Sequence, residues 1–223
     1  SFQYSRNAPL VLKNITLQIP KGKVTAIVGD SGCGKSTLLK LLLRLYMPSY
    51  GEICMGDMNV NNISLRNWRA KCGCVMQDGK LFNDTIQNNI VLDDANIDYD
   101  ALQKAVEVAN ISHEIEVMPQ GYQTMIGEMG RGLSGGQRQR VLIARAHYKD
   151  PDYLFLDEAT NALDTINEQK IVKALNNVFK NRTVIVVAHR LSTIRRADQI
   201  IVLKAGIIIE TGNHQSLMTN KQY

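Results

Sequence analysis

The stretch that most constrains the fold is Gly29-Asp30-Ser31-Gly32-Cys33-Gly34-Lys35-Ser36, which follows a short apolar run and precedes a leucine-rich one. It fits the pattern G-x-x-x-x-G-K-[ST], in which a glycine-rich loop joins a strand to a helix and its backbone N–H groups surround phosphates. Lys35 then reaches the β- and γ-phosphate oxygens, and the Ser36 hydroxyl can bind Mg²⁺. The helix N-terminus adds partial positive charge. We therefore expect an α/β fold around a phosphate-binding strand–loop–helix unit.

Several apolar runs predict the other strands. Runs without polar alternation, which are typical of parallel strands buried on both faces, lie at 153–156 and 183–188. A shorter candidate lies at 72–76. Two hairpins are also expected, because Pro20-Lys21-Gly22 separates strand-like runs and Lys204-Ala205-Gly206 separates two more. The paired runs are 12–19 with 23–28, and 200–203 with 207–210.

The middle of the chain has a different pattern. Residues from about 84 to 150 show helical periodicity and no strong strand, with Leu102, Ala105, Val106 and Ala109 on one helix face. We predict one domain over residues 1–223, in which a nucleotide-binding core (1–83 and 151–223) carries an inserted α-helical subdomain.

Composition excludes several classes of protein. The net charge of +5 comes from scattered Lys and Arg residues, so we expect no nucleic-acid partner. No apolar run approaches the roughly 20 residues that span a membrane, so no direct membrane insertion is expected. The start at Ser1, without methionine, suggests a piece of a longer protein. The four cysteines have no metal-site spacing and are expected to be reduced thiols.

A second set of candidate residues follows the predicted strands. Asp157 ends an apolar run, which places its carboxylate beside a metal ion, and Glu158 can accept a proton from an attacking water or orient it. His189 and Gln77 also end strands, at the edge where open α/β sheets bind ligands. A structural role for His189 remains open, since a lone histidine at a strand end is more often structural than catalytic.

Ser134, Gly135 and Gly136 form a second anion-binding helix start, directly before a run that begins at Gln137. One triphosphate cannot easily occupy two such cradles. We therefore expect these residues to contact the γ-phosphate of a nucleotide held by another copy, in a two-fold dimer with two ATP molecules at its interface. The alternative is that Ser134 only caps its own helix.

Together these motifs resemble the nucleotide-binding domain of ATP-binding cassette (ABC) transporters over essentially the whole chain. Leu133-Ser134-Gly135-Gly136-Gln137 is similar to that family's signature, and the 29–37 loop and Phe155-Leu156-Asp157-Glu158 match its other motifs. The resemblance implies a P-loop NTPase core with a mostly parallel sheet and an antiparallel β subdomain, and ATP hydrolysis with Mg²⁺ in a head-to-tail dimer.

The resemblance also assigns roles to single residues. It implies that Tyr4, with Phe2 as the alternate, stacks on adenine, that Gln77 contacts Mg²⁺ and the attacking water, and that His189 contacts the γ-phosphate. Residues 161–164 look like the D-loop, although Asn161 stands where serine is commoner. The full set of expected ATP ligands is Tyr4, Gly29, Ser31, Gly32, Cys33, Gly34, Lys35, Ser36, Thr37, Ser134, Gly135, Gly136, Gln137 and Asp164. The expected Mg²⁺ ligands are Ser36, Gln77 and Asp157, and the expected catalytic residues are Glu158, His189, Gln77 and Lys35.

Finer features resemble exporters. Residues 81–90 are similar to the exporter pattern, and 126–130 look like the loop that meets the membrane domain, so 77–90 and 126–130 are expected to contact transmembrane domains that this chain lacks. Residues 144–151 and 158–164 look most like bacterial peptide and bacteriocin exporters, which often carry an N-terminal cysteine peptidase. The resemblance implies a place at the cytoplasmic face of the plasma membrane, with this part itself soluble.

The alternative is a soluble ABC ATPase that acts on DNA or ribosomes. DNA-repair members place a long coiled coil between the glycine loop and the signature, whereas about a hundred residues separate them here. Ribosome-acting members carry two such domains in tandem, and this chain has one. The exporter-like segments favour the exporter.

Overall fold

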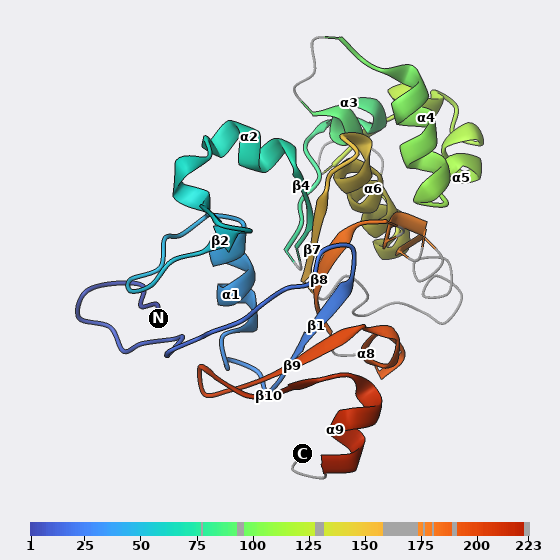
Figure 1. Ribbon diagram of the computed structural model, residues 1–223. Coiled ribbons are helices and arrows are strands. Elements are labelled where there is room, and N and C mark those ends of the chain that lie inside the picture. Colours follow the sequence, from blue (N-terminus) through green and yellow to red (C-terminus); the bar gives the residue numbers. More distant parts are fainter. Residues whose placement is uncertain are drawn as a thin grey trace.

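The centre of the computed structural model is a six-stranded sheet with the strand order β10-β9-β1-β8-β7-β4 (Figure 1). All neighbouring pairs are parallel except β10 with β9. The structure describes residues 1–76, 78–92, 96–127, 132–157, 174–175, 177–179, 181–188 and 191–220. The strands of this sheet are β1 (Val24–Val28), β4 (Cys72–Val75), β7 (Tyr153–Asp157), β8 (Thr183–Val187), β9 (Gln199–Lys204) and β10 (Ile207–Gly212).

Helices and two small antiparallel sheets complete the described part. The helices are α1 (Lys35–Leu42), α2 (Leu65–Ala70), α3 (Ile86–Val91), α4 (Tyr99–Val108), α5 (Ser112–Glu116), α6 (Gly135–Tyr148), α8 (Leu191–Arg196) and α9 (His214–Asn220), with 3₁₀ turns η1 (Val60–Asn62) and η2 (Gly121–Gln123). The small sheets pair β2 (Cys54–Met55) with β3 (Met58–Asn59), and β5 (Asp84–Thr85) with β6 (Met125–Ile126). None of the described helices has both the length and the apolar character needed to cross a bilayer.

Strands β7 and β8 are buried on both faces, which confirms the prediction from the continuous apolar runs. Leu154 and Leu156 of β7 belong to a hydrophobic cluster with side chains of α3–α6, whereas Phe155 belongs to a second cluster with α1. Figure 1 shows the same division, with α1 and α2 on one side of the strands and α3–α6 on the other. Alternate side chains of one strand therefore serve different cores, and a polar residue at either kind of position would be buried.

The predicted helical face in the middle of the chain is confirmed. Leu102, Ala105 and Val106 of α4 and the following Ala109 are all buried, in the same cluster as the sheet residues Leu154 and Leu156. The helices between residues 86 and 148 therefore pack onto the sheet through one continuous apolar cluster.

One predicted hairpin is wrong and the other is confirmed. Residues 12–19 do not pair with β1; Leu12 forms only an isolated antiparallel bridge with Phe2, and residues 13–19 contain no strand. The reason is topological, because both edges of β1 are already occupied by parallel partners, β8 and β9. The second predicted hairpin is β9–β10, which pairs as expected across Ala205 and Gly206.

Candidate active site

The phosphate-binding loop joins β1 to α1, as the motif predicts. Gly29 has φ +147°, and a Cβ added there would lie 2.0 Å from the Leu203 carbonyl oxygen. Gly34, which caps α1, has φ +109°, and its added Cβ would lie 2.7 Å from a Leu12 methyl group. Only glycine fits at both positions. The absence of side chains there lets the loop backbone pass close to Leu203 of β9 and to Leu12 of the N-terminal segment.

Lys35 is held inside the curve of this loop. Its side chain is buried, and its Nζ donates hydrogen bonds to the Gly29 and Asp30 carbonyl oxygens at 2.8 and 2.9 Å. A buried ammonium needs such partners, because transfer of a charge out of water is costly. The Cys33 side chain is buried in the second cluster, so this residue offers the site its backbone rather than its thiol.

Asp157 lies at the carboxyl edge of the same sheet. It pairs with Val187 of β8, and Val187 pairs with Ile27 of β1, so the aspartate stands level with the strand end that enters the phosphate loop. Asp157 is only 4% exposed, and its Oδ1 has no hydrogen-bond partner among the described residues. A buried carboxylate oxygen without a partner is costly, and a cation or its bound water would satisfy it.

This arrangement fits Mg²⁺. The ion prefers oxygen ligands and usually keeps several waters, binding through one or two protein groups together with substrate phosphates. The half-buried Ser36 is the second residue of α1, and Asp157 supplies the carboxylate from two strands away.

Four predicted site residues lie outside the described residues: Gln77, Glu158, Asp164 and His189. The strands before three of them are described and end at one edge of the sheet. Val75 of β4 pairs with Leu156 of β7, next to Asp157, and the Ala188 N–H donates to the Ile27 carbonyl oxygen at 3.1 Å. The roles of these four residues therefore stay predictions, although the strands that precede Gln77, Glu158 and His189 end where those roles require.

The structure distinguishes the two candidate adenine-stacking aromatics. Phe2 is 4% exposed and belongs to the second cluster, whereas Tyr4 is 49% exposed. The Tyr4 hydroxyl forms a 2.9 Å hydrogen bond with Oγ1 of Thr37 in the first turn of α1. The exposure favours Tyr4 as the candidate over Phe2, whose ring is packed in the core, and the stacking role stays a prediction.

The signature residues begin α6. Ser134 is its N-cap, and a capping box is present: the Gln137 N–H donates to Ser134 Oγ at 3.2 Å, and the Ser134 N–H donates to Gln137 Oε1 at 3.0 Å. This confirms that Ser134 caps its own helix. Ser134 and Gly135 are exposed, and α6 packs on the opposite face of the sheet from α1. The two cradles therefore belong to different layers of the molecule.

The segments expected to contact a membrane domain adjoin one another. Asp84 pairs with Ile126 and Thr85 with Met125, which joins 81–90 to the described part of 126–130. Residues 128–130 lie outside the described residues. Sequence reasoning missed what holds this region: the fully buried Asn89 and the partly buried Arg145.

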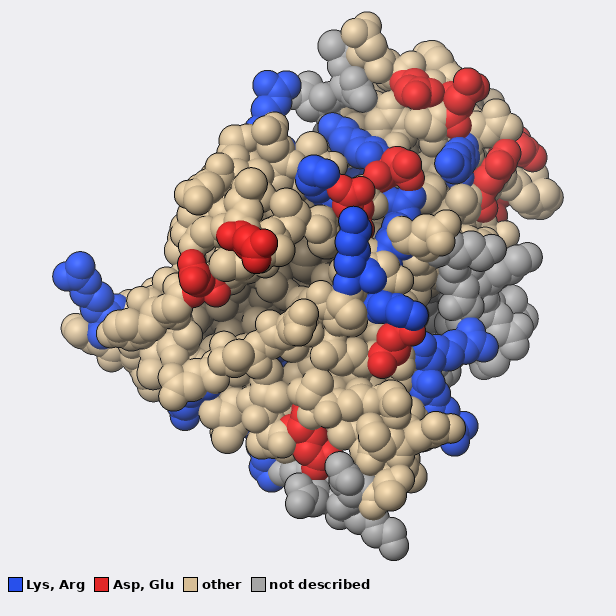
Figure 2. Space-filling model, in the orientation of Figure 1, with Lys and Arg blue, Asp and Glu red and all other residues tan. Residues whose placement is uncertain are grey.

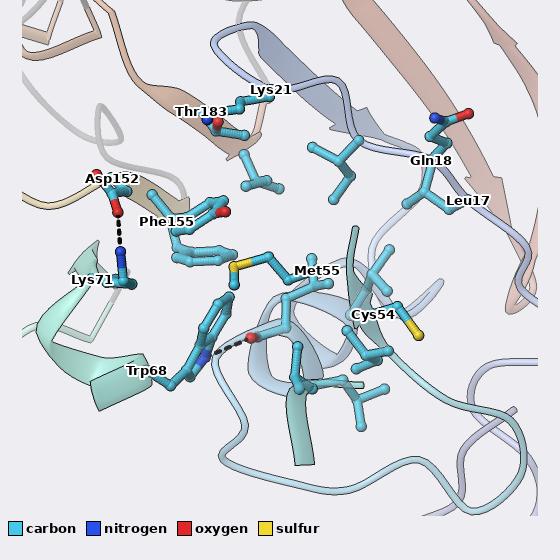
Figure 3. Close-up of a pocket in the computed structure, with 18 of the residues that line it drawn as sticks. Leu17, Gln18, Lys21, Cys54, Met55, Trp68, Lys71, Asp152, Phe155 and Thr183 are labelled. Carbon is cyan, nitrogen blue, oxygen red and sulfur yellow. Dashed lines mark hydrogen bonds and ion pairs between the residues drawn. The ribbon is translucent and has the colours of Figure 1, made fainter. Parts of the chain in front are cut away.

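A pocket of about 1670 Å³ lies elsewhere in the described part of the chain (Figure 3). It is lined by residues at the amino ends of β7 and β8, including Tyr153 and Thr183, and by apolar side chains such as Phe155 and Trp68. Trp68 Nε1 donates to the Leu42 carbonyl oxygen at 3.2 Å. Since the phosphate loop is not part of its lining, this pocket is not the candidate active site.

The surface visible in Figure 2 mixes both signs of charge, with Lys and Arg close to Asp and Glu. Ion pairs join Lys71 to Asp152 at 2.7 Å and Lys23 to Asp198 at 3.2 Å. Such exposed pairs contribute little to stability.

Comparisons with known proteins agree with this geometry. The family model described as ABC transporter matches residues 12–161. The mitochondrial iron-sulfur clusters transporter ATM1 of Chaetomium globosum is 47% identical over 98% of this chain and 36% of its own length. The exotoxin translocation ATP-binding protein PaxB of Pasteurella aerogenes is 44% identical over 99% of this chain and 31% of its own length. The chain thus spans about a third of these relatives. A solved bacterial Atm1-family ABC exporter with ATP bound matches with a TM-score of 0.90 and 42% identity, over 98% of this chain and 38% of that one.

Proposed function

The chain belongs to the ABC transporter family as one of its ATPase domains, and we propose that two copies bind and hydrolyse ATP head to tail to power export across a membrane. The observation that supports this most is the buried Lys35, held in a glycine loop at the same sheet edge as the Asp157 Oδ1, which has no hydrogen-bond partner among the described residues. Phosphoryl transfer needs mainly positioning and charge stabilisation, which these groups supply.

In this proposal the residues act in turn on the phosphates. The 29–37 loop surrounds them with N–H groups, and Lys35 exchanges its loop carbonyl partners for β- and γ-phosphate oxygens. Ser36 and Asp157, with Gln77, hold Mg²⁺, which when bound neutralises charge on the triphosphate. Glu158 accepts the proton of the attacking water.

The second copy completes the site. Ser134 and Gly135 are exposed at the start of α6, where free N–H groups can meet a γ-phosphate. Asp164, Gln137 and His189 are proposed to act at the same phosphate. Since α1 and α6 lie on opposite faces of the sheet, a two-fold arrangement of two copies brings each signature to the other copy's nucleotide.

Light scattering on Glu158→Gln, with and without ATP and Mg²⁺, tests the proposal. We expect a shift from monomer to dimer with ATP, loss of the shift without Mg²⁺, and its loss on adding Ser134→Arg. Glu116→Gln, an exposed carboxylate of α5, is the control for charge. Ser64→Arg removes the N-cap of α2 and is the control for loss of a cap. A variant that binds no ATP would contradict ATP binding, and one that binds ATP but stays monomeric would contradict the dimer.

The exported substrate is the finer part of the proposal. We propose a peptide or bacteriocin-like cargo, handled by transmembrane domains and an N-terminal peptidase in the full-length protein, from residues 144–151 and 158–164 alone. The relatives named above differ in what their names give as cargo, an iron–sulfur cluster or an exotoxin. Stimulation of the full-length ATPase by a peptide with a double-glycine leader is the expected result, and no stimulation would refute the peptide cargo. In that assembly the 77–90 and 126–130 segments face the membrane domains at the cytoplasmic side.

A further inference from the structure

We infer that Tyr46 is a positioning residue for the adenine-stacking ring of Tyr4, and that the Tyr4–Thr37 hydrogen bond fixes this ring relative to the phosphate loop. The inference rests on the proposed function, because it takes ATP as the ligand. It assigns a role to an exposed aromatic residue outside every motif in the sequence.

Tyr4 needs positioning because of where it lies. It belongs to the N-terminal segment, which has no regular strand or helix near this residue, and its side chain is 49% exposed. A ring in such a place would otherwise be ordered only when the nucleotide binds, and that ordering would cost affinity.

Three contacts hold the ring before binding. Its hydroxyl bonds Thr37 Oγ1 at 2.9 Å, and its centroid lies 5.0 Å from Phe2 and 5.3 Å from Tyr46, with interplanar angles of 80° and 87°. Both ring pairs have the edge-to-face geometry that aromatic quadrupoles favour. The contacts come from the core, from α1 and from the segment after α1, so they fix the ring from separate elements.

Tyr46 differs from Phe2 in a way that makes its role testable. Phe2 is a core residue, so its truncation would destabilise the domain, whereas Tyr46 is 42% exposed. The segment that carries Tyr46 is bound to the segment that carries Tyr4: the Tyr50 N–H donates to the Ser1 carbonyl oxygen at 3.1 Å, and the Gln3 N–H donates to Ser49 Oγ at 3.1 Å. Tyr46 and Tyr4 are thus kept side by side by the backbone.

The hydrogen bond between the Tyr4 hydroxyl and Thr37 fixes the distance between the Tyr4 ring and helix α1. Thr37 lies two residues after Lys35 in the first turn of α1, so the Tyr4 ring is tied to the helix that carries the phosphate ligands. A base stacked on this ring and phosphates in the loop would be bound by one connected unit. Stacking uses the π-face that every base has, so this unit serves a purine nucleotide without selecting adenine over guanine.

Calorimetry with ADP, which is not hydrolysed, tests the inference on the whole chain. We expect Tyr46→Ala to weaken ADP binding about 3- to 10-fold, as the loss of one aromatic pair predicts. Tyr46→Phe should bind ADP as the parent does, because the ring remains. Tyr4→Phe keeps the ring but loses the Thr37 contact, and should weaken ADP binding several-fold. Tyr50→Ala, at a more exposed tyrosine of the same segment (67% against 42%), is the control and should leave ADP binding unchanged.

Tripolyphosphate, which has no base, separates positioning from a general structural effect. Its inhibition constant against ATP hydrolysis should be the same for Tyr46→Ala and the parent, and Tyr46→Ala should raise the KM for ATP without changing kcat. Equal weakening of ADP and tripolyphosphate, or unchanged ADP affinity, would overturn the inference while the proposed function stands. A parent chain that binds neither ligand would overturn both.

Discussion

The side-chain amide of Asn89 is a hydrogen-bonding centre whose loss should be costly. It is fully buried; its Oδ1 accepts from the Phe82 N–H at 2.8 Å and from Arg145 at 2.9 Å, and its Nδ2 donates to the Phe82 and Thr85 carbonyl oxygens, each at 3.0 Å. Arg145 also donates to the carbonyl oxygens of Asn89 and Lys80, at 2.6 and 3.0 Å. The guanidinium lies over the Phe82 ring, 5.3 Å from its centroid.

Asn89→Ala removes these four side-chain hydrogen bonds and a fifth, from Nδ2 to the Asp84 carbonyl oxygen at 3.3 Å, and leaves the Phe82 N–H and the Arg145 guanidinium each with one partner fewer. Each bond contributes about 1 kcal/mol net, and each buried group left unpaired costs about 1–3 kcal/mol, with some relaxation toward water. We therefore expect the free energy of unfolding to fall by about 3–5 kcal/mol, at the upper end for single substitutions. For a chain of this size that lowers the Tm by roughly 10 °C.

Urea unfolding followed by circular dichroism measures this loss. The midpoint should fall while the slope m is unchanged, because the exposed surface on unfolding is the same. Gln103→Ala is the matched control: it removes one exposed side-chain bond, to Glu107 at 3.0 Å on α4, and should cost less than about 0.5 kcal/mol. A loss below about 1 kcal/mol for Asn89→Ala would show that the loop is held by other contacts and refute the reasoning.

Three further outcomes follow from single sites. Lys35→Met should weaken ATP binding at least about 100-fold by calorimetry, because it removes the buried cation of the phosphate loop; binding within 10-fold of the parent would contradict its role. Ser134→Ala should lower stability by about 1 kcal/mol in urea, since the hydroxyl that accepts from the Gln137 N–H is lost; an unchanged midpoint would contradict the capping box. Burial, and then the nearby Arg182 charge, lower the pKa of His147 from 6.5 to about 4, so the unfolded chain binds a proton first and stability should fall as the pH drops from 6.5 toward 4. His147→Gln should flatten the Tm against pH in that window, and an equally steep profile would contradict the shift.

The parts of the fold that the sequence predicts are those with a local cause. The runs at 153–156 and 183–188 became β7 and β8 because a sheet covered on both faces needs apolar residues at consecutive positions. The run at 12–19, where apolar and polar residues alternate from Ile15 to Ile19, is also strand-like but forms no strand, because β8 and β9 already occupy both edges of β1. Strand propensity states what a segment can do, whereas pairing depends on which edges remain free.

The candidate site likewise has parts that a local motif predicts and parts that depend on contacts between distant residues. The phosphate loop and the Ser134 cap lie within a few residues of sequence, so their motifs carry the geometry. The contacts between Tyr4 and Tyr46, and between Asn89 and Arg145, join residues 42 and 56 positions apart, and no local pattern marks them. Only the packing of the N-terminal segment and of α3 on α6 brings these side chains together.

Helix α6 connects the two halves of the proposed mechanism. Ser134, at its exposed start, is the residue proposed to meet the partner's nucleotide, and Arg145 lies 11 residues later, about 16 Å along a straight helix. Arg145 holds the Asn89 and Lys80 carbonyl oxygens, and Asn89 in turn holds the backbone of Phe82. In the proposed dimer, these contacts would connect the signature end of α6 to the 80–90 segment through the described residues. The same contacts that stabilise the domain would then carry the nucleotide state to the surface proposed to face the membrane domains.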